Sequence, residues 1–218
     1  LIPTFRERFR EKELELIALT EVGFIHAMST GPINTIEQLQ QSKNWSPSGD
    51  PISENYLKAL GITPIQLSIP DVLSSLQSGL IETVYNSLYG AIVLQWFTKT
   101  QYVIDVPYGY AYGVFALDGK KFDALSEAHK EAIQAAAAIH FPILLEKTRT
   151  SNSDSRKVML DHGIEFQKLD ERAAQVLHEK REEAVSQLIP DSLSKDIYDQ
   201  TMNLLKEYHS KSTGGKTN

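Results

Sequence analysis

The 218-residue sequence contains no cysteine. This absence excludes disulfides, thiolate metal sites and cysteine nucleophiles together, although it identifies no cellular compartment. Long apolar runs are missing as well, since no stretch reaches the 18 residues that a membrane-spanning helix needs. Aromatic residues make up only 9% of the chain. The remaining composition, 41% hydrophobic and 23% charged, is typical of a globular chain long enough for one or two domains.

A strong charge of either sign is also absent. The formal net charge is −6, and acidic and basic residues are spread along the chain. Without a basic stripe, the sequence predicts no nucleic-acid partner. The chain starts at Leu1 rather than at a methionine, and its charged first 19 residues do not have the pattern of a signal peptide. We therefore expect a mature or truncated product whose targeting signal lies outside this sequence.

Recognisable catalytic and metal-binding motifs are missing too. The sequence has no GxSxG elbow, phosphate loop or GxGxxG, and its six histidines are scattered without an HxxxH pair. The adjacent Glu182 and Glu183 are predicted to lie on a solvated helix face. Asp105 is predicted to cap a local turn rather than to act chemically. The sequence thus predicts no enzyme, no cofactor and no metal site.

The strongest structural pattern lies between Gly61 and Gly90. Residues 64–69 are predicted to form a strand, residues 70–78 a helix that Gly79 ends, and residues 81–85 a second strand. A strand–helix–strand unit delivers the residue after its second strand to a ligand crevice. That residue is Asn86, whose amide both donates and accepts hydrogen bonds.

The rest of the chain divides into an α/β part up to about Leu117 and a mostly helical part after it. Before the central unit we expect an exposed helix at 4–13, strands at 14–19 and 24–28, a helix at 36–41 capped by Thr35, a turn at 46–51 and a helix at 53–60. After the central unit we expect a helix at 88–97, strands at 102–106 and 110–117, and a turn at 118–120. A long helix at 126–161, kinked by Pro142, and a strand at 164–168 come next. Helices at 171–186 and 192–208 and a disordered tail complete the chain.

Aromatic and amide side chains gather near the predicted strand ends: Trp45, Tyr85, Asn86, Tyr89, Tyr108, Tyr110, Tyr112 and Phe115. Ligand pockets are mostly apolar and aromatic with a few fixed polar groups, so this set is a candidate binding site. The alternative is that some of these residues form the hydrophobic core. We expect a core position for Tyr89 and Phe115, and strand alternation places Tyr85 on the face opposite Asn86.

Five segments in the same order resemble the substrate-binding subunits of TRAP transporters, the DctP-like receptors. The resemblance spans residues 4–208. Its first three segments are GPINTIEQL at 31–39, ALG at 59–61 with Pro64, and DVLSSLQSGLIE at 71–82. The fourth is Asn86, at the asparagine of the family's "QENP", and the fifth is KFDALS at 121–126. Each segment is a weak signal by itself, whereas the ordered set is specific.

The resemblance implies a periplasmic-binding-protein-like α/β fold, in which two lobes close on a small organic ligand and deliver it to membrane permease subunits. It implies a remnant of the N-terminal lobe at 1–30, a second ligand-binding lobe at 31–117, a crossover strand and long helices at 118–210, and a disordered tail at 211–218. The first part of the N-terminal lobe has no counterpart in this sequence. The implied location is the periplasm.

One departure from the family concerns charge. Alignment with the family's "GLKIRVP" places Trp45 where an arginine binds the ligand carboxylate, and an indole cannot replace that guanidinium fork. Ser87 replaces the family proline after Asn86, and Ile69 stands where the family often has an aromatic residue. The resemblance implies a ligand site of Trp45, Ser48, Ile69, Asn86, Tyr110 and Tyr112.

Two functions follow from this departure. A wall of tryptophan and tyrosines would suit an apolar, aromatic, lipid-like or cationic ligand. Alternatively, Trp45 fills the cleft, and the protein is a ligand-free receptor fragment that acts as a structural or interaction protein and forms a homodimer through its long helices.

Overall fold

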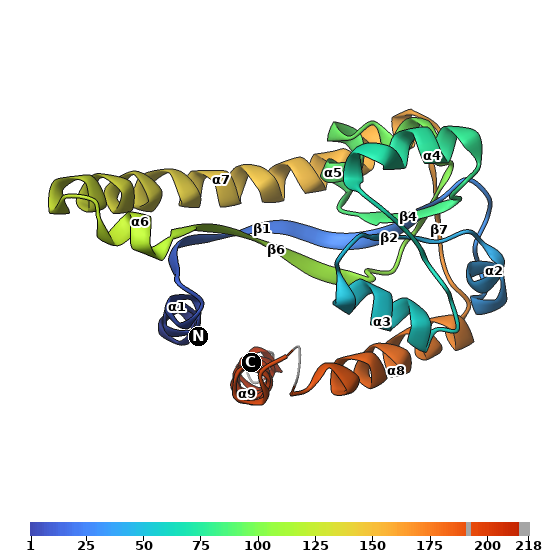
Figure 1. The fold of residues 1–218 in the computed structure, drawn as a ribbon. Helices are drawn as coiled ribbons and strands as arrows, with labels where there is room; N and C mark the ends of the chain where they lie inside the picture. Colours follow the sequence, from blue (N-terminus) through green and yellow to red (C-terminus); the bar gives the residue numbers. More distant parts are fainter. Residues whose placement is uncertain (191–192, 214–218) are drawn as a thin grey trace.

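A single long strand, β1 (Leu14–Ser29), is the axis of the molecule. The computed structural model describes residues 1–190 and 193–213. Residues 14–25 of β1 pair antiparallel with β6 (Gly109–Asp118), forming a long two-stranded ribbon (Figure 1). Its last residues pair antiparallel with β4 (Thr83–Asn86) and β5 (Tyr102–Ile104), and β5 pairs in parallel with β7 (Glu165–Gln167).

The prediction of two separate strands at 14–19 and 24–28 is therefore wrong. The ladder between β1 and β6 continues through two register shifts, between Leu16 and Ala18 and between Glu21 and Gly23. Each shift inserts one extra residue and interrupts the alternation of apolar and polar side chains, which removes the sequence signal without ending the strand. Gly23 accommodates the second shift at φ +113°.

The predicted strand–helix–strand unit is present but shorter. It consists of β3 (Ile65–Leu67), a 3₁₀ turn (Ile69–Asp71), α4 (Val72–Ser78) and β4. Gly79 ends α4 in the left-handed conformation, as predicted. β3 pairs in parallel with β2 (Trp45–Pro47), and a parallel bridge between Asn44 and Thr83 connects this pair to β4. The two strands of the unit are thus separated by β2.

Local capping determines where the short helices begin and end. α2 (Ile36–Gln41) starts with a reciprocal capping box between Thr35 and Gln38. α3 (Pro51–Ala59) begins earlier than predicted because Asp50 accepts hydrogen bonds from the first free backbone N–H groups. α5 (Leu88–Val93) is shorter than predicted, since Gln95 adopts φ +60° and separates it from a 3₁₀ turn (Trp96–Thr98). Asp118 caps a short helix, α6 (Gly119–Asp123), where a turn was predicted.

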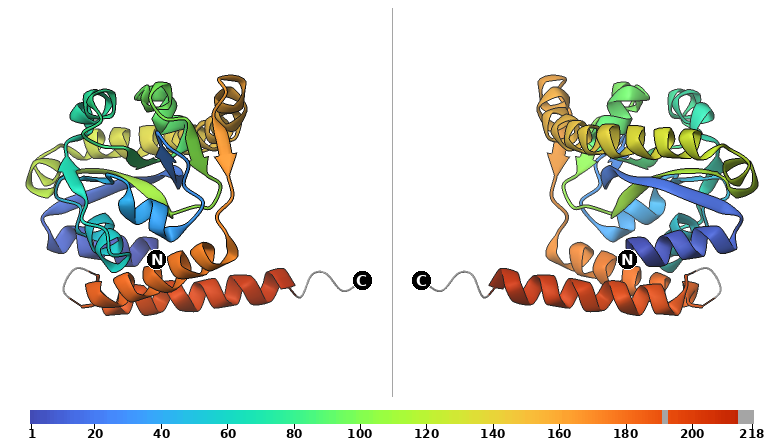
Figure 2. Two further views of the ribbon diagram at one scale, coloured as in Figure 1. Left: turned by 90° about the vertical axis from the view of Figure 1, so that its right-hand side faces the viewer. Right: turned by 90° about the vertical axis from the view of Figure 1, so that its left-hand side faces the viewer.

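Three long helices complete the chain. α7 (Glu127–Asp161) starts at the cap Ser126 and continues through Pro142, and it lies along one side of the ribbon (Figures 1 and 2). α8 (Glu171–Leu188) and α9 (Lys195–Thr213) lie on the opposite side. Residues 211–213 of the predicted tail belong to α9, because no glycine or proline interrupts the sequence before Gly214. The remaining tail and the predicted start of the last helix at Ser192 lie outside the described residues.

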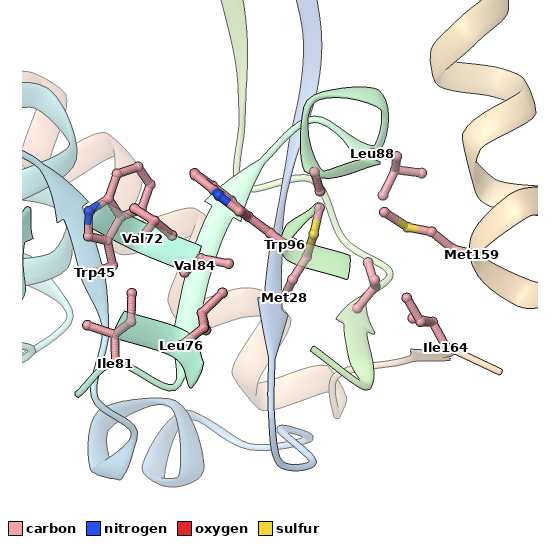
Figure 3. Packing of buried hydrophobic residues seen from close by; sticks show 12 residues of the cluster. Met28, Trp45, Val72, Leu76, Ile81, Val84, Leu88, Trp96, Met159 and Ile164 are labelled. Carbon is pink, nitrogen blue, oxygen red and sulfur yellow. The ribbon is translucent and has the colours of Figure 1, made fainter. Parts of the chain in front are cut away.

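The hydrophobic core has two parts, one on each face of the sheet. Adjacent residues of β1 point to opposite faces, so Met28 belongs to one part and Ala27 to the other. The first part lies under α4, α5 and the end of α7 and includes Trp45, Val84, Trp96 and Met159 (Figure 3). The second part lies between the sheet and helices α2, α3 and α8. A sheet covered by helices on both faces confirms the predicted α/β class.

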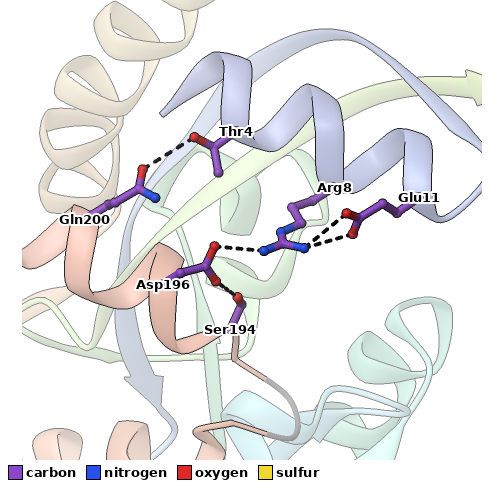
Figure 4. Close-up of polar contacts among 6 residues, drawn as sticks. All are labelled: Thr4, Arg8, Glu11, Ser194, Asp196 and Gln200. Carbon is purple, nitrogen blue, oxygen red and sulfur yellow. Dashed lines mark hydrogen bonds and ion pairs between the residues drawn. The ribbon is translucent and has the colours of Figure 1, made fainter.

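The N-terminal helix α1 (Ile2–Glu11) contacts α9 through polar groups. Arg8 pairs with Asp196 at 2.8 Å and with Glu11 in its own helix, and Thr4 donates to Gln200 at 3.4 Å (Figure 4). These side chains are exposed, so each contact contributes little to stability. Across residues 1–190 and 193–213, no helix is long and apolar enough to cross a membrane.

Candidate functional site

A cavity of about 610 Å³ opens between the start of β6, helix α3 and the second half of α8. This volume lies in the range of small-molecule sites. Five of the six predicted site residues line it: Trp45, Ile69, Asn86, Tyr110 and Tyr112. Ser48 is not among the lining residues, because it lies in the turn after β2, where its backbone N–H donates to the Leu67 carbonyl.

Trp45 forms part of the cavity wall from within the core. Only 2% of its surface is exposed, and its indole Nε1 donates to the Leu67 carbonyl at 3.0 Å. Its ring packs edge-on against Trp96, with 5.2 Å between the ring centroids. Since its one polar hydrogen is already bonded, Trp45 offers the cavity an apolar surface and no hydrogen bond.

Asn86 ends β4 opposite His26 on β1. Its Oδ1 accepts from the backbone N–H of Ser87 at 2.8 Å, and the Ser87 hydroxyl in turn caps α5 by accepting from Gly90. A Cβ at position 90 would lie 2.4 Å from the Asn86 oxygen, so the glycine leaves the space that this amide needs. Within the described part of the chain, the Asn86 amide nitrogen has no hydrogen-bond partner, and it remains available to a ligand.

Three tyrosine rings contact one another in series along the cavity, each pair tilted by 41°. The Tyr108 ring lies 4.4 Å from that of Tyr56 and 4.5 Å from that of Tyr85, centroid to centroid. The Tyr56 hydroxyl donates to the Leu177 carbonyl and the Tyr85 hydroxyl to the Asn44 side chain. The buried Tyr108 hydroxyl has no partner among the described residues. Burial raises the pKa of Tyr56 to about 12 and that of Tyr108 well above its ordinary value, so both hydroxyls stay neutral donors.

Tyr110 lies between this cavity and a second one of about 390 Å³ beneath α7. Its ring meets Phe24 edge-on at 4.8 Å. Burial and a hydrogen bond with the Glu21 carboxylate raise the pKa of Tyr110 to about 12. Glu21 itself holds Arg149 through two bonds of 2.7 and 2.6 Å, and this bonding lowers the Glu21 pKa. The Tyr110 hydroxyl therefore bonds to Glu21, which lines the smaller cavity and not the larger one.

The sequence did not identify several residues that line the cavity, because these residues lie on helices. α3 contributes Ile52, Ser53 and Tyr56, and α8 contributes Arg181, Ala184, Val185 and Leu188. The apolar stripe of the helix predicted at 171–186 was visible in the sequence, but which surface it would meet was not. Asp50 also lines the cavity, with both carboxylate oxygens bonded to the first turn of α3.

Three other sequence interpretations are wrong. Tyr89 and Phe115 are not core residues, since each is 42% exposed, and Phe115 stacks on Phe141 above the ribbon. Asp105 does not cap a turn but binds the Arg156 guanidinium through bonds of 2.7 and 2.8 Å. That guanidinium also lies 4.0 Å from the centre of the Phe166 ring. The turn prediction used only neighbouring residues, whereas the partner of Asp105 lies 51 positions away in the chain.

The structure offers no cluster that would hold a metal. In residues 1–190 and 193–213, no three His, Asp or Glu side chains come together in that way. His26 is half-buried and its Nδ1 lies 3.1 Å from the Ile104 carbonyl oxygen. Burial lowers the His26 pKa, so this imidazole is neutral at pH 7. The cavity presents an aromatic and apolar wall with the Asn86 amide, tyrosine hydroxyls, the Asp50 carboxylate and the Arg181 guanidinium.

Comparison with known proteins relates this geometry to a family. The model of the DctP proteins, bacterial extracellular solute-binding proteins of family 7, matches residues 3–191. A search of curated proteins returns no significant match. Among solved structures, the periplasmic ectoine-binding protein of the TeaABC TRAP transporter from Halomonas elongata superposes with a TM-score of 0.84 at 20% identity, covering 94% of this chain and 67% of that one.

Two further structures are similar in the same way. The extracytoplasmic solute receptor DctP7 from Bordetella pertussis, which binds pyroglutamic acid, has a TM-score of 0.80 and 15% identity over 88% of this chain and 63% of its own. A TRAP solute-binding protein from Xanthobacter autotrophicus, solved with β-D-galacturonate, has a TM-score of 0.81 and 18% identity over 91% and 65%. These likenesses show the fold. The present chain spans about 63% of the length of the Bordetella protein.

Proposed function

Because the chain belongs to the DctP family of bacterial extracellular solute-binding proteins, we propose that it is the larger part of an extracytoplasmic solute receptor. The receptor binds a small organic molecule in the cavity beside β6 and delivers it to the permease subunits of a TRAP transporter. Its location is the periplasm, and it carries out no reaction. The observation that carries the proposal is the gathering of Trp45, Ile69, Asn86, Tyr110 and Tyr112 from four separate segments around one cavity.

The composition of the cavity supports an apolar ligand body. Trp45 stands where related receptors are expected to hold a carboxylate with arginine, and its indole N–H is already bonded to Leu67. The wall built by Trp45 and Ile69 thus has no charge and no free donor. A ring or chain of carbon atoms gains most from this wall, because burying apolar surface contributes about 25 cal/mol per Å². The Asn86 amide then orients one polar group of the ligand.

A further lobe completes the receptor in this proposal. We assign residues 1–30 to the remnant of an N-terminal lobe, 31–117 to the ligand-binding lobe and 118–210 to the crossover and long helices. Exposed apolar side chains on the ribbon and on α7 support this division, since Val114, Phe115, Ile139, Ile143 and Leu144 are each more than 40% exposed. Exposed apolar side chains of this kind are typical of surfaces that another layer of protein covers.

The same exposed residues favour a second candidate, a homodimer of a ligand-free fragment. In that case the apolar side of α7, with Ile139, Ile143 and Leu144, packs against a second copy. Analytical ultracentrifugation of the chain at 1 to 100 μM separates the two. A monomer over this whole range rejects the dimer, and a stable dimer that Ile143→Glu dissociates supports it.

Thermal unfolding with a library of organic acids, amides, aromatic compounds and lipids tests the receptor. Ligand at 100 times its Kd stabilises the protein by about 2.7 kcal/mol, which raises the Tm by about 5–10 °C. Asn86→Ala should abolish most of this shift while the Tm without ligand changes little. Asn55→Ala, in α3 but not among the residues that line the cavity, is the control. If no compound shifts the Tm of the chain or of its longer natural form, the receptor proposal is rejected.

A further inference from the structure

A cation interrupts the apolar stripe of α8. Leu177, Ala184 and Leu188 are buried against α3 and the sheet. Arg181 follows Leu177 by four residues and precedes Ala184 by three, so all of these residues share one side of the helix. That side faces the cavity, which Arg181, Ala184 and Leu188 all line. Arg181 itself is exposed, so its guanidinium stays solvated when the cavity is empty and is accessible to a molecule that enters it.

No carboxylate of the chain pairs with Arg181 within the residues that the structure describes. Its hydrogen-bond partner is Nδ1 of His178, at 3.0 Å and one turn earlier in the helix. The arginines beside the other cavity and the sheet behave differently. Arg149 binds Glu21 and Arg156 binds Asp105, each through two bonds. The fork of Arg181 is therefore free to hold an external anion.

The other polar groups of the cavity also favour an anion. The Asn86 amide nitrogen and the Tyr108 hydroxyl are donors without a partner in the described chain. The carboxylate at the cavity, Asp50, is occupied by the cap of α3, where it accepts from the Ile52 and Ser53 backbone and from the Ser53 hydroxyl. The two unpartnered groups are thus donors, as an anionic group requires, while the Asp50 carboxylate is the acidic side chain that also lines the cavity.

We propose that Arg181 determines the charge selectivity of the cavity, which takes an amphipathic molecule with one anionic group. The apolar body contacts the wall of Trp45 and Ile69, and the anionic group pairs with the guanidinium at α8. This inference rests on the proposed function of the cavity. It assigns charge recognition to α8 instead of to position 45 in β2. Arginine suits this role because its planar fork binds a carboxylate or sulfonate through two parallel hydrogen bonds.

A pair of fluorescent probes tests the proposal on the complete chain. 1-Anilinonaphthalene-8-sulfonate carries one sulfonate on an apolar body, and N-phenyl-1-naphthylamine is the same body without the charge. Trp45 and Trp96, the chain's two tryptophans, both line the cavity, so energy transfer from them reports binding near it. Arg181→Gln should weaken binding of the sulfonate about tenfold or more and leave the uncharged amine unchanged. Arg181→Lys should retain part of the sulfonate affinity, since it keeps the charge but loses the fork.

Two control variants separate the possible outcomes. Arg172→Gln removes the same charge from an exposed position on the same helix and should change neither affinity. Tyr112→Ala removes apolar wall and should weaken both probes. If Arg181→Gln leaves sulfonate binding unchanged, or weakens both probes equally, the role of Arg181 is rejected while the cavity stands. If Tyr112→Ala affects neither probe, neither binds in the cavity, and this result rejects the cavity together with Arg181.

Discussion

Two regions of the molecule bury their apolar surface to different extents. The packed lobe, comprising strands β2 to β5 and β7 with helices α2 to α5 and α8, has helices on both faces of its sheet and holds nearly all of the core. The arm, comprising residues 14–25 of β1, β6 and residues 127–154 of α7, packs its ribbon along α7, and in the part of the chain that the structure describes it contributes no residue to the two core clusters. In α7 the buried residues are Ser155 and Met159, both beyond the arm.

The difference shows how the arm is held. Where apolar packing is thin, an ion pair between Arg149 and Glu21 connects the α7 part of the arm to β1. A second pair, between Arg156 and Asp105, connects the next part of α7 to the packed lobe. Such pairs contribute less than a buried core and weaken with salt and acid. The packed lobe therefore holds most of the buried apolar surface, whereas the arm leaves apolar side chains such as Ile139 exposed.

The largest expected effect contrasts the two regions directly. Leu57 has no exposed surface in the packed lobe, and Leu57→Ala should cost about 2–5 kcal/mol of unfolding free energy through lost burial and a cavity. Ile139 is 61% exposed in the arm, and Ile139→Ala should cost less than about 0.5 kcal/mol. Urea unfolding measures both. Equal losses of unfolding free energy would mean that the arm is covered in solution and that the two regions do not differ in burial.

A smaller effect concerns the joint between α7 and the packed lobe. Asp105→Asn leaves the half-buried Arg156 with a weaker partner and should cost about 1–2 kcal/mol at pH 7. Bonding to Arg156 lowers the Asp105 pKa, so this stability is present above the ordinary pKa of about 4 and is lost as the pH falls through the lower folded value.

Unfolding free energies from pH 7 to pH 2 check this sign. The difference in unfolding free energy between wild type and Asp105→Asn should decrease steadily below about pH 4. Lys157→Gln, an exposed charge change next to Arg156, is the control and should leave the profile unchanged. A difference that stays constant down to pH 2 would show that the ion pair does not hold α7 in place.

Within the packed lobe, the three contacting tyrosines allow a finer test. Tyr56→Phe removes a bond to the Leu177 carbonyl and should cost about 1 kcal/mol. Tyr108→Phe removes a buried hydroxyl that has no partner among the described residues, and it should be neutral or slightly stabilising. Differential scanning calorimetry compares the two. A loss with Tyr108→Phe that matches Tyr56→Phe would reveal a partner for the Tyr108 hydroxyl, such as an ordered water.

The smallest effect lies in the arm. Glu21→Gln should reduce stability by about 0.5 kcal/mol, because Arg149 is mostly exposed. It should also lower the pKa of Tyr110 from about 12 toward its ordinary value of about 10, since a negative charge beside the hydroxyl disappears. Absorbance titration at alkaline pH detects this change. An unaltered tyrosine titration would show that burial alone raises the Tyr110 pKa.

The sequence by itself determined the local features of this protein. Thr35 caps α2, Gly79 ends α4, and α7 extends from Ser126 to Asp161, because each of these signals depends on hydrogen bonds between residues three or four positions apart. The ordered motifs between residues 31 and 126 also identified the family, whose model matches residues 3–191.

The tertiary structure alone decided how the cavity is assembled. Tyr56 meets Leu177 across 121 positions, and Asp105 meets Arg156 across 51. The stripe that contains Arg181 is readable in the sequence, but its placement at the cavity depends on how α8 packs against α3. Contacts of this separation follow from the packing of complete elements, which no short stretch of sequence encodes.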